Sequence, residues 1–216
     1  VHGSEDLTSS FANSCNSSFA NIGLNLNINK FNDLCNSMYF NTSLPTDIPH
    51  AQSRFSLSQN ASQWEIGATA IGQGETVMTP LHALLLTSSI ANGGVVMRPY
   101  LVDSVVSSTG HQIEKNSPQS SGSIMSASEA MQVKTMMEAV VNSGTATSLT
   151  AFNTQIAGKT GTAEVEGSGN NAWFVGFAPA DNPEIAICVL VENSDTSSSY
   201  TAVPIASQLF QYYLNQ

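Results

Sequence analysis

The chain has 216 residues, which suits one domain, or most of one, with a sizeable hydrophobic core. Its 16 acidic and 6 basic residues give a net charge of -10. That balance excludes nucleic-acid binding, which needs clustered Lys and Arg. It also disfavours binding to an anionic membrane surface, which would repel an acidic protein. Only 10% of the residues are charged while 41% are hydrophobic, a composition that excludes a disordered chain.

The first half of the chain predicts helices joined by irregular surface. Apolar residues at helical spacing predict two short helices within residues 11–40. Residues 41–65, rich in Ser, Pro and Asn, predict irregular structure. Thr79 and Pro80 then form the N-cap and first position of a helix, where the missing amide proton of proline is harmless. Asn92, Gly93 and Gly94 end this helix.

A hairpin and a long helix follow. Residues 101–106 and 112–114 flank a Ser-Ser-Thr-Gly turn and predict a small hairpin. Ser126 and Glu129 form a capping box, and the helix that they open runs toward Gly144. The apolar face of this helix comprises Met137, Val140 and Val141.

The last third of the chain predicts strands and then a terminal helix. Strands are expected over residues 154–165, 172–178 and 185–192, with turn residues between them. Residues 201–214 predict a closing helix that carries Ile205, Leu209, Tyr212 and Tyr213. Helices followed by a run of antiparallel strands indicate the α+β class rather than βαβ units.

The three cysteines, Cys15, Cys35 and Cys188, are widely spaced and form no CxxC pair. A zinc or redox motif is therefore not expected. We expect three free thiols, no metal site and no cofactor. No apolar stretch reaches the length of a transmembrane helix, and the first residues lack the basic start and apolar run of a signal peptide.

Gly158-Lys159-Thr160-Gly161-Thr162 is the sharpest chemical signal. A lysine ammonium beside two hydroxyls suits a carboxylate ligand, and the flanking glycines leave room for another backbone to approach. A phosphate-binding loop is excluded because it needs a glycine where Asn153 stands. By itself, Lys-Thr-Gly is equally compatible with an exposed strand lysine.

Two weaker signals precede it. Ser14-Cys15-Asn16 is an S-x-N triplet between two helical patterns, which an ordinary helix cap would also explain. Gly72-Gln73-Gly74-Glu75 stands shortly before the helix that starts with Thr79. A dinucleotide-binding fingerprint would need glycine where Val77 stands, so this segment alone indicates a turn before a capped helix.

In this order and spacing, the three signals resemble penicillin-binding protein transpeptidases, and most closely the monofunctional class B type. The family uses S-x-x-K, S-x-N and K-T-G motifs. No lysine in the chain follows a serine by three residues, so S-x-x-K is absent. We therefore expect residues 1–216 to be the C-terminal two-thirds of such a domain, with the nucleophilic serine ahead of Val1. The resemblance extends to residues 90–94, 98–100, 140–146, 157–164 and 173–179.

The resemblance implies a β-lactamase/transpeptidase-like α+β fold, in which an antiparallel sheet is flanked by helices. The family sheet has five strands, and this chain would supply the last three of them. The first strands and the helix that bears the nucleophile are expected to be missing from this chain.

The resemblance also implies roles for the S-x-N and K-T-G residues. Ser14 would relay a proton to the leaving amine, and Asn16 would bind the first motif's lysine and the substrate amide. Lys159 would supply positive potential beside Ser14.

The segment Thr160-Gly161-Thr162 would bind substrate. The two threonine hydroxyls would hold the terminal carboxylate, and the Thr162 N–H would contribute to an oxyanion hole.

The implied activity is the cross-linking of peptidoglycan stem peptides by serine acyl transfer. Stem peptides and β-lactam antibiotics would bind, at the extracytoplasmic face of the bacterial plasma membrane, with cell-wall synthesis proteins as partners. Two alternatives stay open. One is a serine β-lactamase or β-lactam sensor domain, and the other is a non-catalytic scaffold of the cell-wall machinery.

Overall fold

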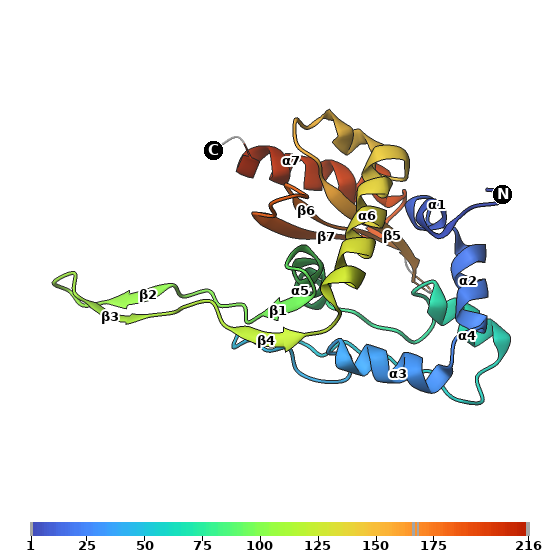
Figure 1. Cartoon of the computed structure of the whole chain (residues 1–216), viewed down its shortest axis with the longest axis horizontal. Helices are drawn as coiled ribbons and strands as arrows, with labels where there is room; N and C mark the ends of the chain where they lie inside the picture. Colours follow the sequence, from blue (N-terminus) through green and yellow to red (C-terminus); the bar gives the residue numbers. More distant parts are fainter. Residues whose placement is uncertain (1, 166, 168, 215–216) are drawn as a thin grey trace.

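The computed structural model describes residues 2–165, 167 and 169–214, and it follows the predicted order of elements. Helices come first, an antiparallel sheet follows, and a helix ends the described chain (Figure 1). The fold is therefore mixed α+β, as the sequence predicts. No helix in the described ranges is long and apolar enough to cross a membrane.

The central sheet has the strand order β5-β6-β7, and both pairs are antiparallel. The predicted strands are confirmed, although the first begins at Ala157 rather than at residue 154. Within the described residues, the outer edges of β5 and β7 have no strand partner. The strands are β5 (Ala157–Glu164), β6 (Asn170–Ala178) and β7 (Ile185–Ser194).

Helices cover both faces of this sheet (Figure 1). Helix α7 (Ala202–Leu214) lies on one face, where Phe210 meets Phe174 edge to face with ring centroids 6.4 Å apart. Helices α5 (Pro80–Ala91) and α6 (Ala127–Ser143) lie on the other. The sheet is thus held between two apolar layers, which is how an α+β domain buries both of its faces.

The face of α7 that packs against the sheet differs from the face formed by the residues that the sequence analysis named. Val203, Ala206 and Phe210 are fully buried, and they recur at helical spacing along the face that contacts the sheet. Both stripes have the period of a helix, so periodicity alone does not decide between them. The residues on the other stripe, Ile205, Leu209, Tyr212 and Tyr213, are exposed.

Four short helices form the N-terminal part of the molecule, where the sequence predicted two. Helices α2 and α3 match the prediction. Helix α1 was not predicted, although Asp6 caps it by accepting a hydrogen bond from the Ser9 N–H at 2.7 Å. Helix α4 was not predicted either, although Ser62 and Glu65 form a capping box at its start. The helices are α1 (Leu7–Ala12), α2 (Asn16–Leu24), α3 (Ile28–Ser37) and α4 (Gln63–Ala70).

The caps predicted for helices α5 and α6 are confirmed. The Thr79 hydroxyl accepts a hydrogen bond from the His82 N–H at 3.2 Å, and Pro80 occupies the first turn of α5. Ser126 and Glu129 bond reciprocally at the start of α6. Local side-chain chemistry therefore fixes where both helices begin.

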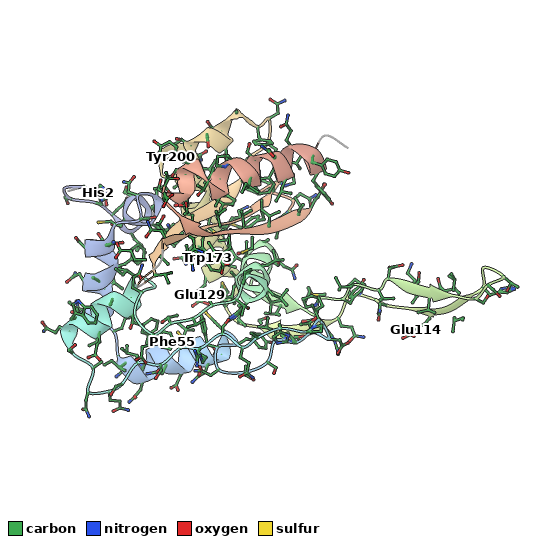
Figure 2. All side chains as sticks on the ribbon, turned by 180° about the vertical axis from the view of Figure 1, so that it is seen from behind. His2, Phe55, Glu114, Glu129, Trp173 and Tyr200 are labelled. Atoms are coloured by element: carbon green, nitrogen blue, oxygen red, sulfur yellow. The ribbon has the colours of Figure 1, made fainter. Side chains whose placement is uncertain are left out.

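The predicted hairpin forms a long arm that extends away from the helices and the central sheet (Figure 1). Its strands β2 (Ser104–Val106) and β3 (Gln112–Lys115) are exposed throughout. Glu114 lies far out along this arm (Figure 2). At its base, β1 (Val95–Met97) pairs with β4 (Ser120–Ser123), a pair that the sequence did not predict.

A close backbone contact joins the end of α6 to the end of α1. The Thr145 N–H donates to the Ala12 carbonyl at 3.3 Å. A Cβ atom on the neighbouring Gly144 would lie only 2.3 Å from the same oxygen. Glycine at this position therefore lets the two helix ends meet.

We expect Gly144→Ala to lower the free energy of unfolding of the full-length protein by about 1–3 kcal/mol, because the added methyl group forces two backbones apart. The measurement is chemical denaturation. Gly67→Ala in α4 is the matched control, because its added Cβ would meet Ala20 at an ordinary 3.6 Å. The control should be neutral or stabilising by up to about 1 kcal/mol, and an equal loss in both variants would contradict the prediction.

Candidate active site

Ser14 lies in a tight turn between α1 and α2 and has a positive φ of 52°. The turn is closed by the Ser14 N–H, which donates to the Phe11 carbonyl at 3.2 Å, and by the Cys15 N–H, which donates to the Ser10 carbonyl at 2.8 Å. A left-handed conformation is unfavourable for a residue with a side chain. Such strain persists where the surrounding structure enforces it, often at functional sites.

Lys159 reaches from strand β5 to this turn. Its ammonium donates hydrogen bonds to the Ser14 hydroxyl and, at 2.7 Å, to the carbonyl of Thr160. It also lies 5.5 Å from the centroid of the Phe11 ring. Burial lowers the pKa of Lys159 to about 8, since desolvation disfavours the charged form.

The ammonium of Lys159 has no carboxylate within ion-pair distance in the described part of the chain. A desolvated cation without a counter-ion attracts an anionic ligand. The same cation makes the hydroxyl of Ser14 a better proton donor, because it stabilises developing negative charge on the oxygen. Together these groups can move a proton and bind an anion.

Strand geometry places the two threonines of the motif on the face opposite Lys159, because side chains alternate along a strand. Thr160 is 6% exposed, and its hydroxyl lies 2.5 Å from the Thr145 hydroxyl. Thr162 is exposed, and its hydroxyl lies 3.3 Å from that of Ser198 in the short 3₁₀ helix η2 (Ser198–Tyr200). A row of hydroxyls therefore follows this face of β5.

The sequence-predicted residues thus occupy neighbouring places in the fold. Ser14 and Lys159 are in direct contact, although 145 positions separate them along the chain. Asn16 follows within the same turn as the first residue of α2, and it is exposed. Gly161 lies opposite Trp173 in the sheet, and a Cβ atom on the glycine would lie 3.4 Å from the Trp173 Cβ.

Sequence reasoning missed the residues that support the motifs. Thr145 and Ser198 bond to the two threonines of β5, and Phe11 packs beside the ammonium of Lys159. Thr145 lies in a segment noted for its family resemblance, but that segment offered no sign of its partner. Each of these contacts joins elements far apart in sequence, so no local pattern could reveal it.

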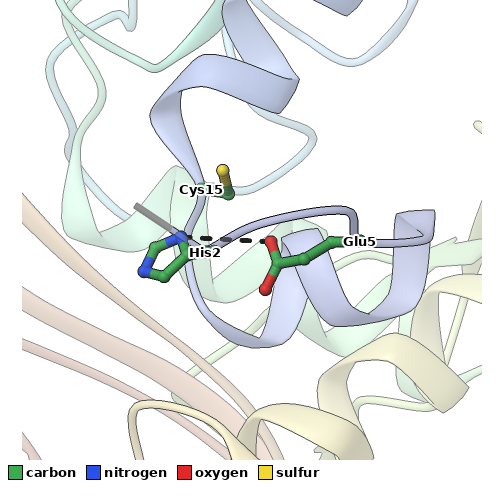
Figure 3. Close-up of side chains that lie close together, drawn as sticks. All are labelled: His2, Glu5 and Cys15. Atoms are coloured by element: carbon green, nitrogen blue, oxygen red, sulfur yellow. Dashed lines mark ion pairs between the residues drawn. The ribbon is translucent and has the colours of Figure 1, made fainter.

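Three side chains of the kinds that bind metals lie close together next to the Ser14 turn, to which Cys15 belongs (Figure 3). One ligand atom each from His2, Glu5 and Cys15 lies within 4.8 Å of the others, and His2 Nδ1 is 3.9 Å from Glu5 Oε2. That carboxylate oxygen is buried and has no hydrogen-bond partner among the described residues. A hydrogen bond with His2 is the main cause that lowers the pKa of the Cys15 thiol to about 7.

Nitrogen, oxygen and sulfur atoms are ligands that Zn²⁺ accepts in proteins, so these three residues could hold such an ion. The lack of a CxxC pair excludes only sites built on paired cysteines, and not a mixed set of ligands. All three cysteines are free thiols, as expected.

The model of the penicillin binding protein transpeptidase domain matches residues 1–211. The chain belongs to this family. Peptidoglycan D,D-transpeptidase PbpA of Mycolicibacterium smegmatis is 31% identical, over 94% of this chain and 42% of that protein. Peptidoglycan D,D-transpeptidase MrdA of Haemophilus influenzae is 29% identical, over 100% of this chain and 37% of that protein. The chain thus spans less than half the length of these penicillin-binding relatives.

Solved structures of the family match the same fold. PBPA from Mycobacterium tuberculosis has a TM-score of 0.84 and 28% identity, covering 99% of this chain and 50% of that one. Pseudomonas aeruginosa PBP2 has a TM-score of 0.83 and 28% identity, covering 98% and 50%. The M. tuberculosis penicillin-binding protein A has also been solved as imipenem and penicillin G acyl-enzyme complexes.

The low pKa of Lys159 predicts how stability depends on pH. The Lys159 ammonium loses its proton with a pKa of 10.5 in the unfolded chain and with a pKa of about 8 in the folded protein. Between these two pH values the unfolded state therefore binds more protons than the folded state. The free energy of unfolding of the wild type, relative to Lys159→Met, should therefore rise by about 3 kcal/mol as the pH passes through this window.

Chemical denaturation of the full-length variants at a series of pH values measures this difference. Lys30→Met, at an exposed position of α3, is the control and should keep the wild-type profile. A constant difference between the wild type and Lys159→Met would show that Lys159 keeps its charge throughout and would contradict the prediction.

Proposed function

We propose that the full-length protein is a serine-type D,D-transpeptidase that cross-links peptidoglycan stem peptides and is acylated by β-lactams. The observation that carries the proposal is the hydrogen bond from the Lys159 ammonium to the Ser14 hydroxyl, made from the strand β5 whose opposite face carries the row of hydroxyls. This arrangement unites the S-x-N and K-T-G motifs in one place. The names of the relatives support the same reaction.

We further propose that residues 1–216 are the C-terminal two-thirds of the transpeptidase domain. The chain carries no S-x-x-K motif, so the nucleophilic serine would lie in a segment ahead of Val1. Within the described residues, the outer edge of β7 has no strand partner, and further strands of a larger antiparallel sheet would pair there. In that assembly the segment ahead of Val1 would also supply the helix that bears the nucleophile.

In the proposed reaction, the external serine attacks the carbonyl between the two D-alanines of a stem peptide. A bond forms between the serine oxygen and the carbonyl carbon, and the bond from that carbon to the leaving D-alanine nitrogen breaks. The base lysine of S-x-x-K accepts the serine proton, and Ser14 passes a proton to the leaving amine. An amine of a second stem peptide then takes the acyl group and frees the serine.

Lys159 and the threonines of β5 would hold the substrate during these steps. The Lys159 ammonium orients the Ser14 hydroxyl and provides positive potential for the substrate carboxylate. The hydroxyls of Thr160 and Thr162 would donate to that carboxylate, and the Thr162 N–H would face the developing oxyanion. Asn16 would bind the S-x-x-K lysine and the substrate amide.

The outer edge of β5, which has no strand partner in the described part of the chain, offers a place for the peptide backbone. An extended peptide can add to an exposed strand by pairing its own N–H and C=O groups with those of the edge. Gly161 lies in the middle of β5 and carries no side chain of its own. Because peptidoglycan is cross-linked outside the cytoplasm, the active site would lie on the extracytoplasmic face of the plasma membrane, among other cell-wall synthesis proteins.

Intact-mass spectrometry of the full-length protein after benzylpenicillin tests the proposal. We expect a stoichiometric adduct on a serine outside residues 1–216. Ser14→Ala should slow acylation by about a hundredfold or more, since general acid–base groups contribute about 10²–10⁴ to rate. Ser17→Ala, an exposed change in the first turn of α2, is the matched control and should acylate at the wild-type rate.

The other outcomes separate the alternatives. An adduct that appears and is rapidly hydrolysed would identify a β-lactamase instead. The absence of any adduct, from a protein shown to be folded, would contradict catalysis and support a scaffold.

A further inference from the structure

Thr145 joins three elements of the site. Its N–H donates to the Ala12 carbonyl at the end of α1, two residues before Ser14. Its carbonyl accepts a hydrogen bond from the Ser199 hydroxyl of η2 at 2.8 Å. Its hydroxyl lies 2.5 Å from the Thr160 hydroxyl of β5. The main chain of Thr145 is therefore fixed from two sides, and its side chain contacts the K-T-G strand.

The two threonine hydroxyls share one hydrogen bond and carry two protons. A hydroxyl has one proton to donate and two lone pairs to accept with. When Thr145 donates to Thr160, the proton of the Thr160 hydroxyl stays free for another acceptor. Because Thr160 is almost fully buried, its hydroxyl has few other orientations available.

We propose that Thr145 is a positioning residue for the carboxylate of the substrate and of β-lactams. Its hydroxyl holds the Thr160 hydroxyl so that the Thr160 proton points to the incoming carboxylate. The inference rests on the proposed function, and it assigns the Thr145 hydroxyl a part in binding strength rather than in the chemical step. Thr145 itself acts only through Thr160.

A purely structural role makes a different prediction. The bonds from Thr145 to Ala12 and Ser199 use main-chain atoms, so they survive replacement of the side chain. Thr145→Val keeps the size and branching of the side chain and removes only the hydroxyl. Thr145→Ser keeps the hydroxyl and removes a methyl group. The pair separates loss of the hydrogen bond from loss of packing.

The test compares acylation of the full-length variants by benzylpenicillin and by its methyl ester, which lacks the negative charge. Thr145→Val should slow acylation by benzylpenicillin at low concentration by about tenfold, the size expected for one hydrogen bond to a charged group. The loss should lie in the concentration that gives half-maximal rate, not in the maximal rate. Acylation by the ester should change by less than about twofold, and Thr145→Ser should restore acylation by benzylpenicillin.

A second measurement uses Thr160→Val as the background. Because Thr145 acts through Thr160, adding Thr145→Val there should cost less than about a further twofold with benzylpenicillin. An equal loss with benzylpenicillin and its ester, or a full tenfold loss in the Thr160→Val background, would overturn the inference. So would a wild-type rate in Thr145→Val. Failure of the wild type to form any adduct would refute the proposed function itself, and this inference with it.

Discussion

The ammonium of Lys159 is the group on which the rest of the site depends. It is desolvated, its pKa is lowered to about 8, and its hydrogen bonds go to a hydroxyl and a carbonyl rather than to a carboxylate. A cation in this position costs free energy unless an anion or a strong dipole faces it. The fold keeps it there because β5 belongs to the sheet that helices cover on both faces, while the outer edge of β5 has no strand partner among the described residues.

The contact between Lys159 and Ser14 requires that two segments far apart in sequence be held in a fixed position relative to each other. Gly144 allows the end of α6 to approach the Ala12 carbonyl, and Thr145 bonds both to that carbonyl and to Thr160. The strained turn at Ser14 begins directly after this junction. One short connection thus couples the S-x-N turn to the K-T-G strand, and a shift at either end would move the proton-relay hydroxyl relative to the ammonium.

Features with a local cause could be predicted from the sequence. The caps at Thr79 and Ser126 follow from side chains that bond to backbone within one turn, and the three strands follow from their alternation. The buried stripe of α7 could not be predicted, because two stripes have helical spacing and only the sheet selects between them. Motif chemistry located Lys159, whereas its supporting partner Thr145 depends on tertiary contacts that leave no periodic trace.

The central claim is that Ser14 and Lys159 act as one unit, and a double-mutant cycle on the rate of benzylpenicillin acylation tests it most directly. Ser14→Ala, Lys159→Met and the double variant would be measured in the full-length protein. If the two groups form one relay, the double variant should acylate no more than about threefold more slowly than the slower single variant. If the two losses multiply instead, the residues act independently and the account of a shared site is wrong.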